Sequence, residues 1–333
     1  MDVKPTIAFI TGGYSGESVI SYQSAITIEN NLDTNKFLVY KIDITPNEWF
    51  FEGDDGEKIL VDKNDFSIVV KGKKILFAAV LVGIHGTPAE DGKLLGYFDL
   101  LNLPYTGCDA AVSAITFNKR YTVAVASFAG INVARSLHIF KQHPATVQLI
   151  TDTLQLPVFV KPNNGGSSIG MSKVFKVEDL SSSLEKAFKE DDQLLIEEFI
   201  SGREFTVGVF RNKGEIITLP ITEVLTTKDF FDYEAKYTVG KSEEITPAEV
   251  EETIAGKIRA TARKVYEIFN CRGVVRIDFI YNEKAGAPYM LEINTVPGQS
   301  DASIVPKQIK AMGWTLKEFY TVLIEEALER RQL

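Results

Sequence analysis

Four polar side chains that could hold a cation lie in one stretch near the end of the chain. Arg276, Asp278, Glu292 and Asn294 belong to RIDFIYNEKAGAPYMLEINT, in which two segments rich in Val, Ile, Phe and Tyr flank turn-forming residues. A hairpin centred on Ala285 would place Asp278 opposite Glu292 and Arg276 opposite Asn294. Because side chains alternate along a strand, all four would share one face. Adjacent carboxylate and amide oxygens predict a Mg²⁺ site that serves a nucleotide. An ordinary amphipathic hairpin with a solvated charged face is the alternative.

A second stretch has the residue types that bind phosphate. LPVFVKPNNGGSSIGMSKVFKV predicts a strand over Leu156–Val160, a loop over Lys161–Gly170 and a strand over Met171–Val177. A P-loop is excluded, since it requires G-x-x-x-x-G-K-[ST] leading into a helix. A flexible Gly/Ser hairpin can instead offer backbone N–H groups and hydroxyls to phosphates, with Lys161 at its base as a point charge. A plain surface hairpin would give the same pattern.

The next segments are candidates for binding the rest of a nucleotide. Gln193–Phe199 reads as an apolar strand whose end could bind adenine through main-chain groups, with Glu204 in reach of a ribose hydroxyl. A polar strand edge is the alternative. Glu223–Pro247 is long, charged and dotted with aromatic residues, which favours a functional loop such as a lid.

The N-terminal stretch predicts an α/β domain with an anion-friendly turn. A strand over Thr6–Thr11 runs into GGYSGE and then a helix. In that helix, Val19, Tyr22 and Ile26 stand at helical spacing. G-x-G-x-x-G is absent, so this is not the dinucleotide fingerprint. Glu17 at the helix start either complements the helix dipole or binds a ligand. His85 follows the strand predicted over Ala79–Val82, at the edge where open α/β sheets bind ligands, and is either a site residue or a structural one.

Length, composition and charge narrow the class of protein. With 333 residues, the chain is long enough for two or three domains. Its 24% of charged residues and formal net charge of −9 argue against a nucleic-acid partner, because there is no general excess of basic residues. No apolar segment predicts export or a membrane span. Cys108 and Cys271 have no metal-like spacing and are expected to be free thiols in a reducing cytoplasm.

Eight motifs in order extend these observations over nearly the whole chain. They are GGYSGE, HGTPAEDG, NKRYT, KPNNGGSSIGMSKV, IEEFISGREFTV, YEAKY, RIDF and LEINTVPGQSDASIVP. In this set the chain resembles the D-alanine–D-alanine ligases of the ATP-grasp superfamily. The resemblance implies a three-domain α/β fold whose central and C-terminal α+β domains clasp ATP. The N-terminal parallel α/β domain would span residues 1–118, the central domain with the glycine-rich loop 119–205, and the C-terminal domain with the lid and Mg²⁺ site 206–333.

The resemblance also implies an activity and a site. The reaction would condense two D-alanines to D-alanyl-D-alanine for peptidoglycan, through a D-alanyl phosphate, with release of ADP and phosphate. The implied ligands of two Mg²⁺ ions, for which Mn²⁺ could substitute, are Asp278, Glu292 and Asn294. The implied ATP contacts are Lys119, Lys161, Ser168, Glu197, Glu198, Ile200, Glu204 and Lys236. The implied catalytic residues are Glu17, Ser167, Tyr237, Arg276 and Gly298. The implied contacts to the amino acids, besides Glu17, are His85, Ser303 and Ile304.

Within that set the resemblance assigns individual roles. Glu17 would hold the ammonium group of the first D-alanine, with Ser167 and Tyr237 in a hydrogen-bond chain to the phosphate loop and lid. Lys236 would approach the γ-phosphate. Arg276 and the Gly298 N–H would stabilise an oxyanion. Ser303 and Ile304 would contact the carboxylate of the second substrate.

Some features depart from the family pattern or leave the substrate open. Asn163 and Asn164 occupy loop positions that are often charged in relatives, and Gln299 stands where an apolar residue is expected. Tyr237 favours an amine nucleophile over D-lactate. A ligase for another carboxylate and amine, a D-alanine–D-lactate ligase, and a nucleotide-binding module without turnover are the alternatives. We expect a cytoplasmic homodimer that binds D-alanine and ATP, and neither nucleic acid nor membrane.

Overall fold

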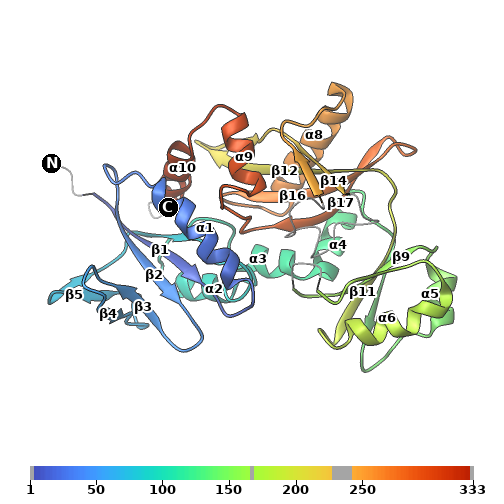
Figure 1. The fold of residues 1–333 in the computed structure, drawn as a ribbon, viewed down its shortest axis with the longest axis horizontal. Coiled ribbons are helices and arrows are strands. Elements are labelled where there is room, and N and C mark those ends of the chain that lie inside the picture. Colours follow the sequence, from blue (N-terminus) through green and yellow to red (C-terminus); the bar gives the residue numbers. More distant parts are fainter. Residues whose placement is uncertain (1–3, 166–168, 227–241, 331–333) are drawn as a thin grey trace.

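A computed structural model describes residues 4–165, 169–226 and 242–330. Its elements form three main sheets arranged along the long axis of the molecule (Figure 1). None of the helices in these ranges combines the length and apolar character needed to cross a bilayer.

The first sheet is built from the N-terminal part of the chain. Its strand order is β4-β3-β2-β1-β7, and β1 pairs in parallel with both β2 and β7. The strands are β1 (Thr6–Gly12), β2 (Leu38–Ile44), β3 (Trp49–Glu52), β4 (Lys58–Leu60) and β7 (Ala79–Val82). A separate hairpin consists of β5 (Ile68–Val70) and β6 (Lys73–Ile75), and the accompanying helices are α1 (Ser18–Asn30) and α2 (Lys93–Leu100). The predicted parallel α/β unit is therefore present.

Helix α1 packs on the core through a face that carries two serines. The helix predicted around Val19, Tyr22 and Ile26 is present, but these three side chains are exposed. The residues of α1 that are buried are Ser21, Ser24, Ala25, Thr27 and Ile28. The two serines tolerate burial because their hydroxyls hydrogen-bond to His85, whose loop packs against this side of the helix.

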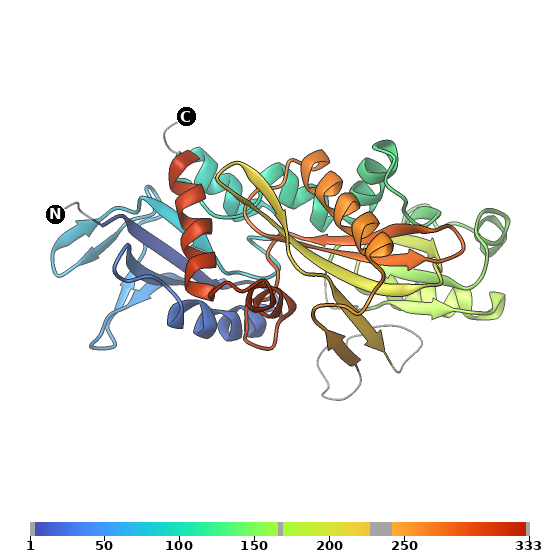
Figure 2. The same cartoon turned by 90° about the horizontal axis from the view of Figure 1, so that it is seen from above.

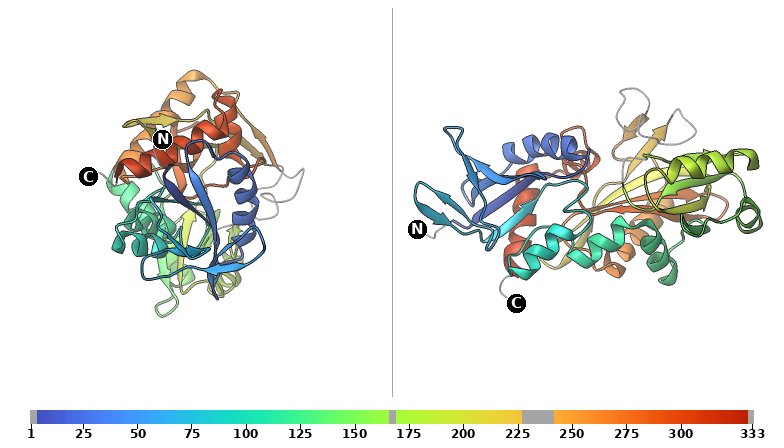
Figure 3. Two further views of the ribbon diagram at one scale, coloured as in Figure 1. Left: turned by 90° about the vertical axis from the view of Figure 1, so that its left-hand side faces the viewer. Right: turned by 90° about the horizontal axis from the view of Figure 1, so that it is seen from below.

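Two consecutive helices connect the first sheet to the second. α3 (Ala110–Phe117) is capped by Asp109, whose carboxylate accepts from the N–H of Val112 at 2.9 Å. α4 (Lys119–Phe128) follows at once and is capped by the Asn118 side chain. Both helices run along one side of the molecule between the sheets (Figure 3).

The second sheet has the order β10-β9-β11-β8 and is antiparallel throughout. Its strands are β8 (Ser136–Phe140), β9 (Val158–Pro162), β10 (Ser172–Val174) and β11 (Gln193–Glu198). The helices beside it are α5 (Val147–Thr153), the short 3-10 helix η1 (Val177–Asp179) and α6 (Leu180–Ala187). Lys161 lies inside β9, not at the start of the following loop, because the strand ends at Pro162, two residues later than predicted.

The third sheet carries the hairpin identified from the sequence. Its order is β15-β14-β12-β16-β17, with β13 paired to β12. The strands are β12 (Arg203–Asn212), β13 (Glu215–Thr218), β14 (Thr222–Thr226), β15 (Ser242–Ile245), β16 (Val275–Asn282) and β17 (Ala287–Asn294). α8 (Glu252–Ile268) covers one face, and α9 (Ile304–Ala311) and α10 (Leu316–Glu329) end the chain. The ends of the predicted 223–247 loop are paired strands, since Glu223 lies opposite Ile245.

The two ends of the chain share one hydrophobic core. Phe319 and Tyr320 of α10 pack in a buried cluster with Ile7 and Phe9 of β1, and Figure 2 shows α10 crossing beside the first sheet. The expected three-domain division stays a prediction, and its second boundary, at 205/206, falls inside β12. Because the core joins segments distant in sequence, the first and third units are packed together.

Candidate active site

The β16–β17 hairpin has the register expected from the sequence. Asp278 lies opposite Glu292 and Arg276 opposite Asn294, and a β-bulge follows between Asp278 and Phe279. The Arg276 guanidinium donates to both oxygens of Asp278, at 3.0 Å each, and the Thr206 hydroxyl donates to Asp278 as well. Burial alone would lower the pKa of Arg276, but the charge of Asp278 and the hydrogen bonds to it outweigh this effect and raise it.

Glu292 and Asn294 complete a compact group of oxygen donors. The Asn294 amide donates to Asp278 at 3.3 Å and to Glu292 at 3.4 Å, and Arg276 Nη2 lies 3.9 Å from Glu292 Oε1. In the part of the chain described, no three His, Cys, Asp or Glu side chains converge. A cation here would therefore use two carboxylates, the amide oxygen after a flip of Asn294, and oxygens of a bound nucleotide. That donor set fits Mg²⁺.

The second sheet supplies a buried lysine beside a carboxylate. Lys161 of β9 forms an ion pair with Glu197 of β11, and both side chains are largely buried. They share one face of the sheet, because Lys161 lies opposite Leu195, two residues before Glu197. The predicted phosphate lysine and the predicted adenine contact are thus direct neighbours.

The glycine-rich loop is anchored at its first residues. Lys119 Nζ donates to the Gly165 carbonyl at 2.6 Å, which brings this lysine to the loop. The Asn163 side chain accepts from the N–H of Arg120 at 2.9 Å, and both the N–H and the amide of Asn164 donate to Asp191. The two asparagines therefore tie the loop to α4 and to the segment before β11.

The remaining predicted nucleotide residues lie where β11 leads into β12. The Glu198 carboxylate accepts from the N–H of Gln155 at 2.8 Å, and its own N–H donates to the carbonyl of Arg135. Ile200 lies in the connection between the two strands, and Glu204 pairs with Val224 and Ile280.

The N-terminal unit contributes two carboxylates, of which the sequence reasoning identified one. Glu17 is the N-cap residue of α1 and lies against Gly86. Gly86 has φ +68°, and a Cβ there would come within 2.6 Å of Ser15 Oγ, so this turn requires glycine. Glu90 was missed as a site residue. Its carboxylate accepts from the N–H of Gly86 at 2.8 Å.

Glu90 is perturbed by the other charged residues of the site. Burial, followed by the charge of Glu17, raises its pKa to about 7, while Arg276 opposes the rise and Glu292 adds to it. The two predicted centres, on the N-terminal loops and on the β16–β17 hairpin, are therefore within electrostatic reach of one another. Glu90 could have been identified from the sequence, because it is an acidic residue of the motif HGTPAEDG, which follows a predicted strand.

His85 is buried, and its ring is held by protein groups. Its Nε2 lies 3.1 Å from Ser24 Oγ, and its backbone N–H donates to Ser21 Oγ at 2.9 Å. Burial, followed by the charge of Arg276, lowers the pKa of His85 to about 4, although a hydrogen bond with the backbone of Val296 opposes this. The imidazole is therefore neutral near pH 7.

The segment after β17 brings together the other predicted substrate residues. Gly298 lies against Ser303, since a Cβ on Gly298 would be 2.8 Å from Ser303 Oγ. Ser303 is the N-cap residue of α9, so Ile304 is the first residue of a helix that the sequence reasoning did not predict. The Ser303 hydroxyl makes no capping bond and lies 2.8 Å from Ser300 Oγ.

Four predicted site residues lie outside the described ranges. They are Ser167, Ser168, Lys236 and Tyr237. Cys108 and Cys271 are buried free thiols, as expected.

Comparisons with known proteins agree over nearly the whole chain. The models of the D-ala D-ala ligase N-terminus and C-terminus match residues 6–108 and 117–325. A D-alanine–D-alanine ligase from Flavobacterium johnsoniae is 44% identical and one from Azobacteroides pseudotrichonymphae 41%, over 97% and 96% of this chain and 99% and 98% of theirs.

Solved structures show the same fold. A D-Ala:D-Ser ligase from Enterococcus faecalis superimposes with a TM-score of 0.88 at 30% identity, covering 98% of this chain and 100% of that one. A D-alanine–D-alanine ligase from Bacillus anthracis complexed with ATP gives a TM-score of 0.79 at 27% identity, covering 98% and 99%.

The three sheets and the oxygen-rich hairpin are those of an ATP-grasp ligase. The chain belongs to the D-alanine–D-alanine ligase family. The family, enzyme class and fold predicted from the motifs are therefore confirmed.

Proposed function

We propose that this protein joins two molecules of D-alanine to D-alanyl-D-alanine, using ATP and releasing ADP and phosphate. The observation that supports this most strongly is the hairpin register, which groups Arg276, Asp278, Glu292 and Asn294 on one face in a chain of this family. A carboxylate must attack an anionic γ-phosphate, so the site has to offset the repulsion between the two.

The nucleotide would lie between the second and third sheets. Lys161 and Lys119 would contact its phosphates, with Ser168 in the loop and Lys236 near the γ-phosphate. The Lys161–Glu197 ion pair supports this role, because it places a largely buried lysine beside an opposite charge on the sheet face that would meet the nucleotide. Glu197, Glu198, Ile200 and Glu204 would contact adenine and ribose.

The hairpin would bind Mg²⁺ together with the nucleotide. Asp278, Glu292 and Asn294 would hold two Mg²⁺ ions, or Mn²⁺ in their place. Bound there, these cations would neutralise the phosphate oxygens and align them for transfer.

The first D-alanine would be bound by the N-terminal loops. Glu17 would pair with its ammonium group and His85 would stand behind it, while Ser167 and Tyr237 would extend the hydrogen-bond chain to the lid. The carboxylate oxygen attacks the γ-phosphorus and ADP leaves, which gives D-alanyl phosphate. This mixed anhydride is sensitive to water, so closure over it protects it from hydrolysis.

The second D-alanine would be held at the start of α9. Ser303 and the N–H of Ile304 would bind its carboxylate, and the uncapped helix N-terminus favours an anion there. Its deprotonated amine attacks the acyl carbon, an oxyanion forms on the former carbonyl oxygen, and the C–O bond to phosphate then breaks. Arg276 and the Gly298 N–H would stabilise that oxyanion, each contributing about 3 kcal/mol.

We further propose a cytoplasmic homodimer. The use of ATP as a substrate supports a cytoplasmic location. The exposed side chains of Val19, Tyr22 and Ile26, at helical spacing on the outer side of α1, support burial against a second copy. Sedimentation equilibrium tests the dimer, and a monomer at micromolar concentration would exclude it.

The experiment that tests the function measures ADP release and dipeptide formation with MgATP. D-alanine alone should give ADP and D-alanyl-D-alanine in equal amounts, whereas L-alanine should give neither. Adding D-serine or D-lactate to D-alanine reports the second substrate, and D-lactate is expected to give little ester. Equal stimulation of ADP release by L-alanine would overturn the assignment to D-amino acids.

A further inference from the structure

Gln299 is a buried polar residue at a position where an apolar side chain is expected. Only 7% of its surface is exposed, and both polar atoms of its side chain are hydrogen-bonded. A buried amide is destabilising unless such bonds compensate for its desolvation. The hydrogen bonds of Gln299 therefore indicate what a glutamine does at this position beside Gly298.

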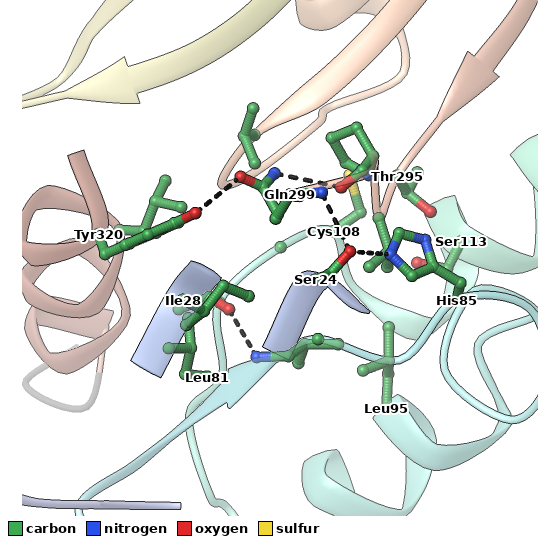
Figure 4. A pocket seen from close by; sticks show the side chains of 18 residues that line it. Ser24, Ile28, Leu81, His85, Leu95, Cys108, Ser113, Thr295, Gln299 and Tyr320 are labelled. Atoms are coloured by element: carbon green, nitrogen blue, oxygen red, sulfur yellow. Dashed lines mark hydrogen bonds between the residues drawn. The ribbon is translucent and has the colours of Figure 1, made fainter. Parts of the chain in front are cut away.

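The contacts of Gln299 connect three segments that are far apart in sequence. The Tyr320 hydroxyl, on α10, donates to Gln299 Oε1 at 3.2 Å. The backbone N–H of Gln299 donates to Ser24 Oγ of α1 at 3.1 Å, and Ser24 Oγ lies 3.1 Å from His85 Nε2. Figure 4 shows Gln299 between Tyr320 on one side and the Ser24–His85 pair on the other. All of them line a cavity of about 30 Å³ where the two chain ends meet.

The Gln299 side chain also folds back on its own turn. Its Nε2 donates to the carbonyl of Pro297 at 3.1 Å, which closes a ring around Gly298. The turn is thus fixed on both sides of Gly298: by the Pro297 carbonyl before it and by the Gln299 N–H after it. Ser303 packs against Gly298 from a third direction.

We propose that Gln299 is a positioning residue for the ligation step. Held by Tyr320 and Ser24, it keeps the Gly298 N–H aimed at the oxyanion that forms when the second amine attacks the acyl phosphate. This inference rests on the proposed function. A small displacement of an oxyanion donor is sufficient to slow that step, because stabilisation depends on a donor–oxygen distance close to 3 Å.

The inference predicts uncoupling and not a uniform loss of activity. Phosphoryl transfer precedes the step that needs the Gly298 N–H, so D-alanyl phosphate still forms in a variant with a displaced turn. If the amine attacks slowly, D-alanyl phosphate leaves the site and is hydrolysed in solution, where water cleaves its mixed anhydride without help from the Gly298 N–H and releases D-alanine and phosphate. ADP then accumulates in excess of dipeptide.

The test compares Gln299→Leu, Tyr320→Phe and the double variant with the wild type. We expect each single variant to release several-fold more ADP per dipeptide and to form dipeptide about tenfold more slowly, at unchanged KM for ATP. Because both residues act through one hydrogen bond, the double variant should be no worse than Gln299→Leu alone. Tyr266→Phe is the matched control, since that buried hydroxyl donates to the Gly273 carbonyl instead.

The outcomes separate this inference from the proposed function. No dipeptide from the wild type would refute the function itself. A normal wild type together with an ADP-to-dipeptide ratio that stays at the wild-type value in both single variants would refute only the role of Gln299. An ADP-to-dipeptide ratio raised equally by Tyr266→Phe would also refute this role. So would additive losses in the rate of dipeptide formation in the double variant. Tyr320→Phe, which keeps the ring, covers the case in which Gln299→Leu does not fold.

Discussion

Neutralising Glu292 should abolish catalysis and leave the fold almost unchanged, whereas neutralising Asp278 should damage both. The side chain of Glu292 is 38% exposed, and its ion pair with Arg276 spans 3.9 Å. A pair of this kind contributes about 0.2–1 kcal/mol to stability. The side chain of Asp278 is 13% exposed and receives two hydrogen bonds from Arg276 and one from Thr206. Breaking such a buried pair costs about 3–5 kcal/mol.

The assay measures unfolding and turnover on the same preparations. In urea unfolding without nucleotide, the free energy of unfolding of Glu292→Gln should lie within about 1 kcal/mol of the wild-type value. That of Asp278→Asn should be several kcal/mol lower. ADP release by Glu292→Gln should fall by at least about 100-fold, because the residue would act on charge in the transition state. Saturating MgATP should stabilise the wild type by about 2.7 kcal/mol at 100 times Kd, and Glu292→Gln by less.

Glu283→Gln is the matched control for these variants. It removes the same charge from the same hairpin, at an exposed turn residue to which no site role is assigned, and should retain both stability and activity. Full activity in Glu292→Gln would refute the metal assignment. An unfolding free energy as low as that of Asp278→Asn would refute the reasoning from exposure.

Three further substitutions test other parts of the site. The pKa of Glu90 is raised to about 7, so its contribution to stability is complete below its unfolded value of 4.5 and is lost as the pH rises through 7. Glu90→Gln should therefore stabilise the protein by about 1–3 kcal/mol at pH 8 and by much less at pH 5. A difference in the free energy of unfolding between variant and wild type that is the same at both pH values would contradict this. Lys161→Met should raise KM for ATP by about 10–100-fold, since a charge-assisted contact is lost; an unchanged ATP titration would count against that role. Ser303→Ala should raise KM for the second D-alanine by about tenfold, measured by substrate saturation, with a wild-type value excluding the contact.

The hairpin and its register could be predicted because period-two patterning is a local property of the sequence. Arg276, Asp278, Glu292 and Asn294 followed from the alternation of side chains and from one short turn. The β-bulge after Asp278 could not be predicted, because the pattern does not show where a strand gains a residue. The motifs supplied the family, and with it the three-sheet fold.

Other features depend on packing between distant segments. Helical spacing of Val19, Tyr22 and Ile26 predicted helix α1 but not which side of it packs, and the face that contacts the His85 loop carries serines. The convergence of Glu90 with Glu17 and Arg276 needs the first and third sheets in contact. The Gln299–Tyr320 bond likewise depends on α10 returning to the N-terminal sheet.

The most direct test of the central claim follows oxygen from D-alanine to phosphate. The reaction is run with MgATP and D-alanine labelled with ¹⁸O in its carboxylate, and the released phosphate is analysed by mass spectrometry. If that carboxylate attacks the γ-phosphorus, each phosphate formed with a dipeptide carries one ¹⁸O atom. Phosphate without label, released together with dipeptide, would contradict the acyl phosphate and the role proposed for this site.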